Sequence, residues 1–534
     1  MDKALSMGQK SAIGSFQLFL GQLVSTVILG ISSIFVAIFI SEGDYGLFAV
    51  ALIPITTLLL FQDWGIGPAM TKYCATYRGT DNEGNLRKII ISGLTFETVT
   101  GLTLTLFSLF IANFVASEIF GKPESAFLIT LFSITIIFTA VYMSSQSIFA
   151  GFERMELTTI TMIVLATTQG VISPLLVYLG FGAFGAVIGY TLGAVVSGTT
   201  AVVLLYFAIF RKLDYKAVNN DSLYQVLKPL LSYGIPLAVV ILIGGISSQF
   251  YSLLMASYTD IAMVGNYRIS ANFAGFLAFF TFPIHTVLFP AFSKLDPLRD
   301  KHLLKTIYAS SVKYTALVLI PATIAIMVLS KPMISTIFGN KWFDAPFFLT
   351  ISVIGNLLAL MGSLSFGRLL TAQGETKMML KLSLLVLCIG IPISFLLIPP
   401  LGITGLIIVG YVGGIPSMII GIYWVWKKYE VKADFSTSAK IFFASSISGL
   451  ITYLFISVFS LASWIMLSLG ALLFLLIYLI FAPLVGAITQ KDINNFRSMF
   501  ANLGIISKLL EILLILIEKF LKIYVWFAKR IKQL

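Results

Sequence analysis

The chain has 534 residues, of which 58% are hydrophobic and 11% are charged, and its formal net charge is +12. Soluble domains carry about 25% charged residues, so this composition excludes a water-soluble globular protein. The apolar runs are continuous and do not alternate with a period of two, which excludes a β-barrel. Neither the two cysteines nor the two histidines have the spacing of a disulfide framework or a ligand set, so no metal and no cofactor is expected.

Fourteen apolar segments follow one another along the chain, and each is long enough to cross a hydrocarbon core of ~30 Å. The first is too long for a cleaved signal peptide, so we interpret it as a spanning helix. Prolines inside the segments, such as Pro54 and Pro321, indicate kinks. The predicted spans lie at 12–40, 45–70, 89–116, 125–150, 157–179, 183–210, 230–257, 262–291, 306–335, 345–370, 378–398, 403–426, 438–460 and 463–487.

The Lys and Arg residues divide unequally between the two sides of this predicted topology. The odd-numbered connections contain only Lys122, Lys331 and Lys341, and Arg268 lies inside a predicted helix. All the other Lys and Arg residues lie in even-numbered connections or in the tails. Cytoplasmic loops carry the excess of these cations, so we predict a multi-pass cell-membrane protein with both termini in the cytoplasm. The positive charge thus sets orientation and does not indicate nucleic-acid binding.

The sequence contains a weak internal repeat. Residues 68–72, PAMTK, match residues 290–294, PAFSK, at an offset of 222. The other matches, at an offset of 222 or 221, are Tyr45 with Tyr267, Glu153 with Glu375, and Gly189–Tyr190 with Gly410–Tyr411. Four matches in order at nearly one offset indicate a duplicated unit. Each copy holds six helices, an even number, so both copies enter the membrane from the same side.

The predicted fold is therefore an all-α integral membrane protein of about fourteen helices. Two parallel six-helix lobes span residues 1–215 and 216–432, and an extra helix pair spans 433–490. In the tail, 491–534, charged residues recur at three, four or seven residues and apolar residues fill the rest. This pattern predicts an amphipathic helix on the cytoplasmic interface, with a fifteenth spanning helix as the alternative.

Five short stretches combine glycines with aromatic or apolar residues. They are EGDYGLF at 42–48, DWGIGPA at 63–69, LGFGAFGAVIG at 179–189, LSYGIPL at 231–237 and VGNY at 264–267. These stretches resemble the signatures of oligosaccharide flippases. Their order and spacing resemble the multidrug/oligosaccharidyl-lipid/polysaccharide (MOP) exporter superfamily over nearly the whole chain to about residue 487.

This resemblance implies a flippase that moves a lipid-linked oligosaccharide or polysaccharide precursor from the cytoplasmic to the outer leaflet. The expected ligand is a glycan on a polyprenyl or dolichyl phosphate or pyrophosphate, and membrane lipids surround the protein. A glycan polymerase or glycosyltransferases are expected protein partners, and no nucleic acid is expected.

Arg268, in the eighth predicted helix, is the first candidate for substrate binding. Charged side chains within a bilayer are costly and usually mark a transport pathway. A guanidinium matches phosphate oxygens two at a time, so Arg268 is expected to hold the phosphate of a lipid-linked substrate. The alternative is that its side chain snorkels to the outer interface.

Two acidic residues are candidates for ion coupling. Glu97 lies within the third predicted helix, where it is expected to bind a coupling proton or Na⁺ or to pair with a cation. A hydrogen bond between helices is the alternative. Asp63 lies near the inner end of the second helix, where it is expected to couple ions, to cap a helix or to pair with Lys72.

Five further residues are candidates for contacting the substrate. Gln22, Gln249 and Asn272 lie within predicted helices, where they are expected to bind sugar hydroxyls or to form interhelical hydrogen bonds. Lys72 and Lys294 are related by the repeat, at the inner ends of helices two and eight. They are expected to attract an anionic headgroup at the cytoplasmic entrance or merely to set topology.

No enzyme constellation is present, and no Walker loop indicates ATP hydrolysis. The chain is therefore predicted not to be an enzyme. A membrane-bound glycosyltransferase or polymerase would need a large catalytic outer loop, and the outer loops here are short. A lipid II flippase and a multidrug exporter of the same superfamily remain as alternatives. The former usually has several cavity arginines, and the extra helix pair argues against the latter.

Overall fold

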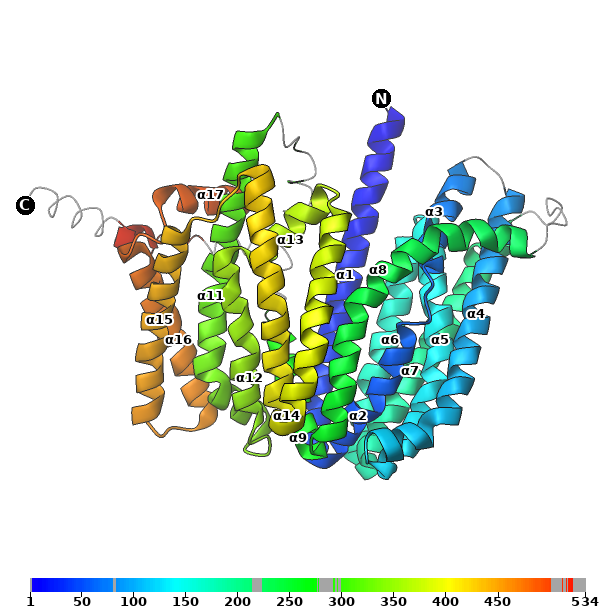
Figure 1. Ribbon diagram of the computed structural model, residues 1–534, viewed down its shortest axis with the longest axis horizontal. Helices are drawn as coiled ribbons and strands as arrows, with labels where there is room; N and C mark the ends of the chain where they lie inside the picture. The colour runs from blue at the N-terminus through cyan, green and yellow to red at the C-terminus, as the bar shows by residue number, and fades with distance from the viewer. Residues whose placement is uncertain are drawn as a thin grey trace, which may run out of the picture. The chain divides into compact units, whose positions relative to one another are not determined.

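The computed structural model describes residues 2–79, 83–213, 223–275 and 299–500, together with residues 277, 292, 295, 511, 515 and 517–521. The side chains of residues 2–16 and of a few others lie outside this description. Throughout the described residues the regular structure is helical (Figure 1). The all-α class predicted from the sequence is thus confirmed.

The helices follow the predicted apolar segments as far as these are described. The first half of the chain forms α1 (Asp2–Phe39), α2 (Glu42–Leu59), α3 (Ile66–Gly79), α4 (Glu83–Phe114), η1 (Val115–Ile119), η2 (Pro123–Ser125), α5 (Ala126–Gly151), α6 (Met155–Leu176), η3 (Val177–Phe181), α7 (Gly182–Ala208) and η4 (Phe210–Lys212). The second half forms α8 (Leu223–Tyr258), α9 (Ile261–Gly275), α11 (Lys301–Phe338), α12 (Ala345–Val353), η5 (Ile354–Met361), α13 (Ser363–Ala372), α14 (Thr376–Tyr429), α15 (Phe435–Val458), α16 (Ser463–Leu484) and α17 (Gln490–Phe500).

Within the described residues, nine helices are long and apolar enough to cross a membrane, or ten if one bent pair is a single span. Two of these nine are too long for one crossing. The run Met155–Lys212 has 58 residues, which as a straight helix would extend for roughly 87 Å at ~1.5 Å per residue. The chain is therefore a multi-pass membrane protein, and the number fourteen stays a prediction.

The first of these long runs is the antiparallel pair α6–α7. Gly180 and Gly182, with φ of 91° and 50°, break the run between the two helices. A glycine stripe on α7 then contacts α6. A Cβ added at Gly189 would lie 2.4 Å from the backbone nitrogen of Ser173, and one at Gly193 would lie 2.9 Å from Gln169 Cβ. Small residues at this spacing let the helix backbones approach closely.

The second long run, the 54-residue α14, bends at Gly402, where φ is 54°. Beyond this bend, Gly405 packs on the carbonyl of Leu397, and Gly413 packs near Gly390. Gly413 lies after Gly405 in the chain, but its partner Gly390 lies before Leu397. The two halves of α14 therefore run antiparallel.

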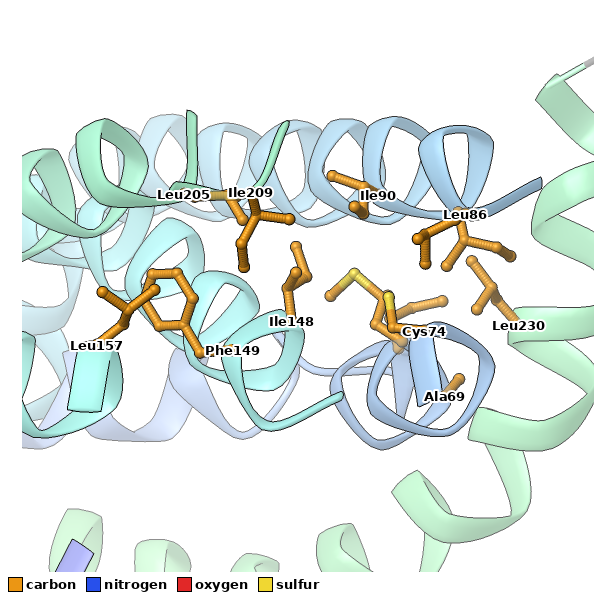
Figure 2. Packing of buried hydrophobic residues seen from close by; sticks show 13 residues of the cluster. Ala69, Cys74, Leu86, Ile90, Ile148, Phe149, Leu157, Leu205, Ile209 and Leu230 are labelled. Carbon is orange, nitrogen blue, oxygen red and sulfur yellow. The ribbon is translucent and has the colours of Figure 1, made fainter. Parts of the chain in front are cut away.

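A buried hydrophobic cluster joins α3 to α8 (Figure 2). Its residues include Cys74 of α3, Leu86 of α4, Phe149 of α5 and Leu230 of α8. A second cluster lies around α11, α13 and the end of α14. The two clusters share positions at the 222-residue offset of the repeat. These pairs are Met70 with Phe292, Leu86 with Tyr308, Ile90 with Val312, Ile148 with Leu370 and Ile209 with Val431.

The chain divides into two compact units. One consists of Met1–Gly265 with Ile391–Leu406, and the other of Asn266–Gly390 with Ile407–Leu534. Within the second unit, α15 and α16 (orange) pack against α11 (Figure 1). The predicted lobe boundaries at residues 215 and 432 remain predictions.

The described start of the tail, α17, packs against α11. In α17, Asp492 forms an ion pair with Lys313 at 2.5 Å, and Asn495 donates a hydrogen bond to the Tyr314 hydroxyl at 2.8 Å. Burial raises the pKa of Asp492, but the Lys313 ammonium and the hydrogen bonds from Thr489 lower it by more. The pKa of Asp492 therefore lies below its ordinary value. Most of the predicted amphipathic helix lies outside the described residues.

Two predicted spans, 45–70 and 345–370, are interrupted, and this corrects their interpretation as continuous helices. The first is broken between α2 and α3. The second bends by 61° at Gly362, after the 3₁₀ turn η5. In the bilayer, backbone groups freed by such a break need a partner within the protein. Tyr411 supplies one, because its hydroxyl donates toward the Ile351 and Ser352 carbonyls and accepts from the Gly355 N–H at 3.1 Å.

We expect Gly189→Ala to destabilise the fold by at least ~1–3 kcal/mol, because the added methyl meets the Ser173 backbone. Its repeat counterpart provides a matched control. A Cβ at Gly410 meets no atom within 4 Å, so Gly410→Ala should be neutral or slightly stabilising. Thermal unfolding of the purified variants in detergent measures the difference, and equal melting temperatures would contradict the proposed close packing of α6 and α7.

We expect Tyr411→Phe to cost about 1–3 kcal/mol of stability, because three backbone groups lose their hydroxyl partner while the ring is retained. Tyr423→Phe is the control on the same helix, since the Tyr423 side chain is exposed. The same unfolding measurement serves here. A Tyr411→Phe protein as stable as the control would show that the break in the tenth predicted span does not depend on this hydroxyl.

Candidate functional site

In the first unit, Gln62, Asp63 and Glu97 lie at or beside the break between α2 and α3. The chain leaves α2 at Leu59 and re-enters a helix at Ile66, with Gly65 at a φ of 78°. Gly65 contacts Gly234 of α8 so closely that a Cβ on Gly65 would lie 2.1 Å from the Gly234 carbonyl oxygen. These glycines belong to the stretches 63–69 and 231–237, so the two stretches meet backbone to backbone.

Glu97 of α4 is buried next to this break. Only 2% of Glu97 and 1% of Gln62 is exposed. The Gln62 amide donates a hydrogen bond to Glu97 Oε2, whereas Glu97 Oε1 has no hydrogen-bond partner among the described residues. An unpaired buried acceptor costs about 1–3 kcal/mol, and more if it is charged.

Asp63 lies in the same break, between Gln62 and the start of α3. Its Oδ1 accepts a hydrogen bond from the Gly67 N–H at 3.3 Å, which caps the start of α3. Gln62, the residue before it in the chain, donates to Glu97 Oε2. The structure therefore places the two predicted ion-coupling residues beside the same break and adds Gln62, which the sequence analysis missed. The only signal for Gln62 was an amide beside Asp63 in an apolar segment.

Lys72 is exposed on α3 and is bound by aromatic rings. Its ammonium lies 4.0 Å from the centre of the Tyr233 ring and 5.5 Å from that of Tyr73. The two rings also contact each other edge to face at 6.4 Å. Lys72 thus makes cation–π contacts, and no ion pair between it and Asp63 occurs in the described chain. Its repeat counterpart, Lys294, lies outside the described residues.

The two glutamines of the first unit have different surroundings. The amide oxygen of Gln249 on α8 accepts from the hydroxyls of Thr56 and Thr57 on α2, at 3.2 Å and 3.4 Å. Gln249 therefore links α2 to α8. Gln22 is exposed and donates to Thr26 on its own helix at 3.3 Å, so it forms no interhelical hydrogen bond in the described residues.

Arg268 and Asn272 lie on α9, in the second unit. One face of α9 is bound to α12, because Asn266 accepts from the backbone N–H groups of Asp344 and Ala345 at 3.2 Å and 3.1 Å. Ser270, four residues on, donates to the Ala345 carbonyl at 2.7 Å. Two residues along a helix is about half a turn, so Arg268 and Asn272 lie on the opposite face.

Arg268 is only half-buried, and no hydrogen bond or ion pair to its guanidinium occurs among the described residues. Arg268 thus has no carboxylate partner in the described part of the chain, and it lies on a face of α9 that is not packed against α12. The side chains of His, Cys, Asp and Glu form no group of three suited to a metal ion in the described chain.

Comparison with known proteins places these features in a family. The model of the family described as "Polysaccharide biosynthesis protein" matches residues 11–296, more than half of the chain. The lipopolysaccharide biosynthesis protein WzxC of Escherichia coli K12 is 24% identical over 414 residues, which cover 76% of this chain and 75% of WzxC.

Solved structures resemble the fold. The lipid II flippase MurJ in an inward closed conformation superimposes with a TM-score of 0.69 at 16% identity, covering 88% of this chain and 98% of MurJ. An inward-facing multidrug resistance MATE family transporter of the MOP superfamily gives a TM-score of 0.64 at 17% identity, covering 76% of this chain and 94% of that one. The chain belongs to the polysaccharide biosynthesis protein family, and its fold is similar to that of the MurJ and MATE transporters.

Proposed function

We propose that the protein is a flippase that moves a lipid-linked oligosaccharide or polysaccharide precursor from the cytoplasmic to the outer leaflet by alternating access. The proposal includes fourteen spans, twelve of them in two parallel six-helix lobes and two in an extra helix pair. Both termini then lie in the cytoplasm. The name of WzxC supports a role in polysaccharide biosynthesis, and the name of MurJ shows that a similar fold flips a lipid-linked substrate.

The observation that carries the choice of substrate is the guanidinium of Arg268, which is unpaired within the described residues. A lipid-linked glycan presents a phosphate or pyrophosphate between its lipid and its sugar, and a guanidinium binds phosphate oxygens in pairs. Asn272 shares the face of α9 and supplies an amide for sugar hydroxyls. Lys72, on its two tyrosines, supplies a cation that attracts the headgroup at the cytoplasmic entrance, together with Lys294.

The same geometry weighs against the two alternative substrates. A cationic drug would be repelled by the Arg268 guanidinium, which has no acidic partner where the structure describes the chain. Lipid II shares the phosphate chemistry of the proposed substrate, so it is the stronger competitor. Glycan polymerases and glycosyltransferases remain proposed partners, because they would consume or supply the substrate.

The function is tested by reconstituting the full chain in vesicles that contain a fluorescent polyprenyl-pyrophosphate oligosaccharide in both leaflets. We expect the protein to increase the fraction of this lipid that an external glycosidase can reach. Vesicles with lipid II and vesicles exposed to a cationic dye run in parallel. Movement of lipid II alone would assign the chain to peptidoglycan precursors, and export of the dye alone would reject the flippase proposal.

We expect Arg268→Ala to slow movement of the lipid-linked glycan roughly tenfold to hundredfold, because a charge-assisted hydrogen bond of about 1.5–3 kcal/mol is lost. Arg268→Lys should recover only part of the rate, since an ammonium cannot bind two oxygens in the same plane. Arg211→Ala removes an exposed arginine and is the control. If Arg268→Ala moves the lipid at the rate of the control, Arg268 does not bind the phosphate.

A further inference from the structure

The helix α17 is fixed at the level where α11 leaves the hydrocarbon core. Its Asp492 forms an ion pair with Lys313 of α11 at 2.5 Å. The next charged residue along α11 is Lys331, 18 positions further on. Eighteen residues of α-helix rise ~27 Å, close to the ~30 Å thickness of a hydrocarbon core. Lys313 therefore lies at one interface, on the side predicted to be cytoplasmic, and it holds α17 there.

Asp492 fastens α17 in two ways. Besides pairing with Lys313, its carboxylate accepts from the Thr489 backbone N–H at 2.8 Å and from the Thr489 hydroxyl at 2.6 Å. This arrangement is a capping box at the start of a helix. Asp492 and Ile493 are buried, whereas Lys491 is exposed. One side of α17 thus faces the protein, and Lys491 lies outside this contact.

The acidic side chains of the tail are neutralised within the protein. Residues 491–534 contain three acids, Asp492, Glu511 and Glu518, against eight Lys and Arg residues. Arg497 donates to both carboxylate oxygens of Glu511, at 2.8 Å and 3.1 Å, and lies 3.4 Å from Glu518. With Asp492 on Lys313, each of the three acids has a cationic partner. The tail therefore keeps an excess of cations that its own carboxylates do not offset.

The described helical residues between 511 and 521 have a buried and an exposed face. Ile517 and Leu521 are 8% and 7% exposed, whereas Ile515 is 45% exposed and Lys519 is also exposed. Residues four apart share one face of a helix, and two residues make about half a turn. Ile515 and Lys519 therefore lie together on the outer face. An apolar side chain beside an ammonium is typical of a helix that lies in a headgroup layer.

The exposed lysines of the two tail segments lie near each other. Gln490 donates a hydrogen bond to Glu518 at 3.3 Å, so the residues that follow them, Lys491 and Lys519, are neighbours in space. No ion pair to either lysine occurs among the described residues. We call Lys491, Ile515 and Lys519 the basic face of the tail.

We propose that the basic face binds the headgroups of anionic phospholipids in the cytoplasmic leaflet, with the two ammonium groups on phosphates and Ile515 between the lipids. This inference goes beyond glycan transport and does not depend on it. The cytoplasmic leaflet has a negative surface potential that attracts basic segments next to spanning helices. Neutralising the three tail acids removes the charges that such a surface would repel. An acidic protein would match the lysines, but the exposed Ile515 and the level of α17 favour lipid.

The proposal is tested with the full chain in nanodiscs that contain no lipid-linked glycan. Cys388→Ser removes the exposed native cysteine, Cys74 is buried, and Ile515→Cys carries a bimane label. The discs consist of phosphatidylcholine, with or without about a third of phosphatidylglycerol, and all contain a lipid with a nitroxide on its headgroup, which quenches bimane at short range. We expect roughly twofold stronger quenching with phosphatidylglycerol, because basic segments are drawn to anionic surfaces. Raising NaCl from about 0.1 M to 1 M should reverse this gain, because the Debye length falls from ~10 Å to ~3 Å.

Two double variants locate the contact. Lys491→Gln combined with Lys519→Gln should remove about half or more of the gain in quenching, because each lysine near an anionic surface contributes to the attraction. Arg211→Gln combined with Lys212→Gln removes two exposed cations after α7, which is the same change in net charge, and should keep the gain. If the two double variants behave alike, the basic face is not the site of binding and the proposal fails.

Hydrogen exchange gives a second measurement on the native sequence, in case the labelled protein does not fold. The amides of residues 517–521 should exchange roughly tenfold more slowly in the anionic discs, because bound lipid opposes local opening. Equal quenching and equal exchange in both kinds of disc overturn the proposal and leave the basic face to an acidic protein. Strong quenching in both lipids that salt does not change would mean apolar insertion alone, which also overturns it. None of these outcomes decides whether the chain moves a lipid-linked glycan.

Discussion

The bilayer requires the protein to satisfy its own backbone, because no water is available to pair with a freed N–H or carbonyl group. A regular helix pairs its own backbone groups, so partners from elsewhere in the protein are needed only where a helix is interrupted. Among the described residues, such places include the α2–α3 break, the bend at Gly362 and the turn at Gly402. Contacts from other segments hold the first two.

The two interrupted spans solve the same problem differently. After α12 the freed backbone is paired by the Tyr411 hydroxyl and, at Leu360, by Ser438 at 2.9 Å. At the α2–α3 break, the partners within the described residues are the Asp63 cap and the close glycine contact with α8, and a buried carboxyl stands beside them. The first break is thus closed by neutral donors and acceptors, whereas at the second Glu97 Oε1 is buried without a hydrogen-bond partner among the described residues.

Hydropathy predicted much of this fold but not its breaks. Apolar runs and flanking charges show where a segment can cross, and both interrupted spans are apolar enough to be predicted as continuous helices. Whether the backbone stays helical depends on side chains far away in sequence, such as Tyr411 for residues 351–355. Glu97 was identifiable because a carboxyl in an apolar run is rare. Its pairing with Gln62 was not, because only the three-dimensional packing of α4 brings residues 35 positions apart together.

The internal repeat, too, was only partly visible in the sequence. Matches such as Met70 with Phe292 were visible as motifs, and the structure adds buried counterparts, such as Ile90 with Val312, that no motif marks. The repeat also has limits. Tyr190 packs its ring on Phe132 of the unbroken α5, whereas Tyr411 pairs with the backbone of the broken span. The ring of one tyrosine thus packs on an unbroken helix, whereas the hydroxyl of its counterpart pairs with a break in the backbone.

The stretches that resemble flippase signatures owe their residue types to packing. A Cβ at Gly46 would lie 1.9 Å from the Ile261 carbonyl oxygen, and one at Gly182 would lie 2.8 Å from Asp44 Oδ2. With Gly65 against Gly234, these glycines are positions where a backbone touches another segment and a side chain would not fit. Such motifs identify a fold that several transporters share. The polar residues outside these contacts are therefore the candidates for substrate and ion specificity. Arg268 and Glu97 are two of them, and each has a polar group without a hydrogen-bond partner among the described residues.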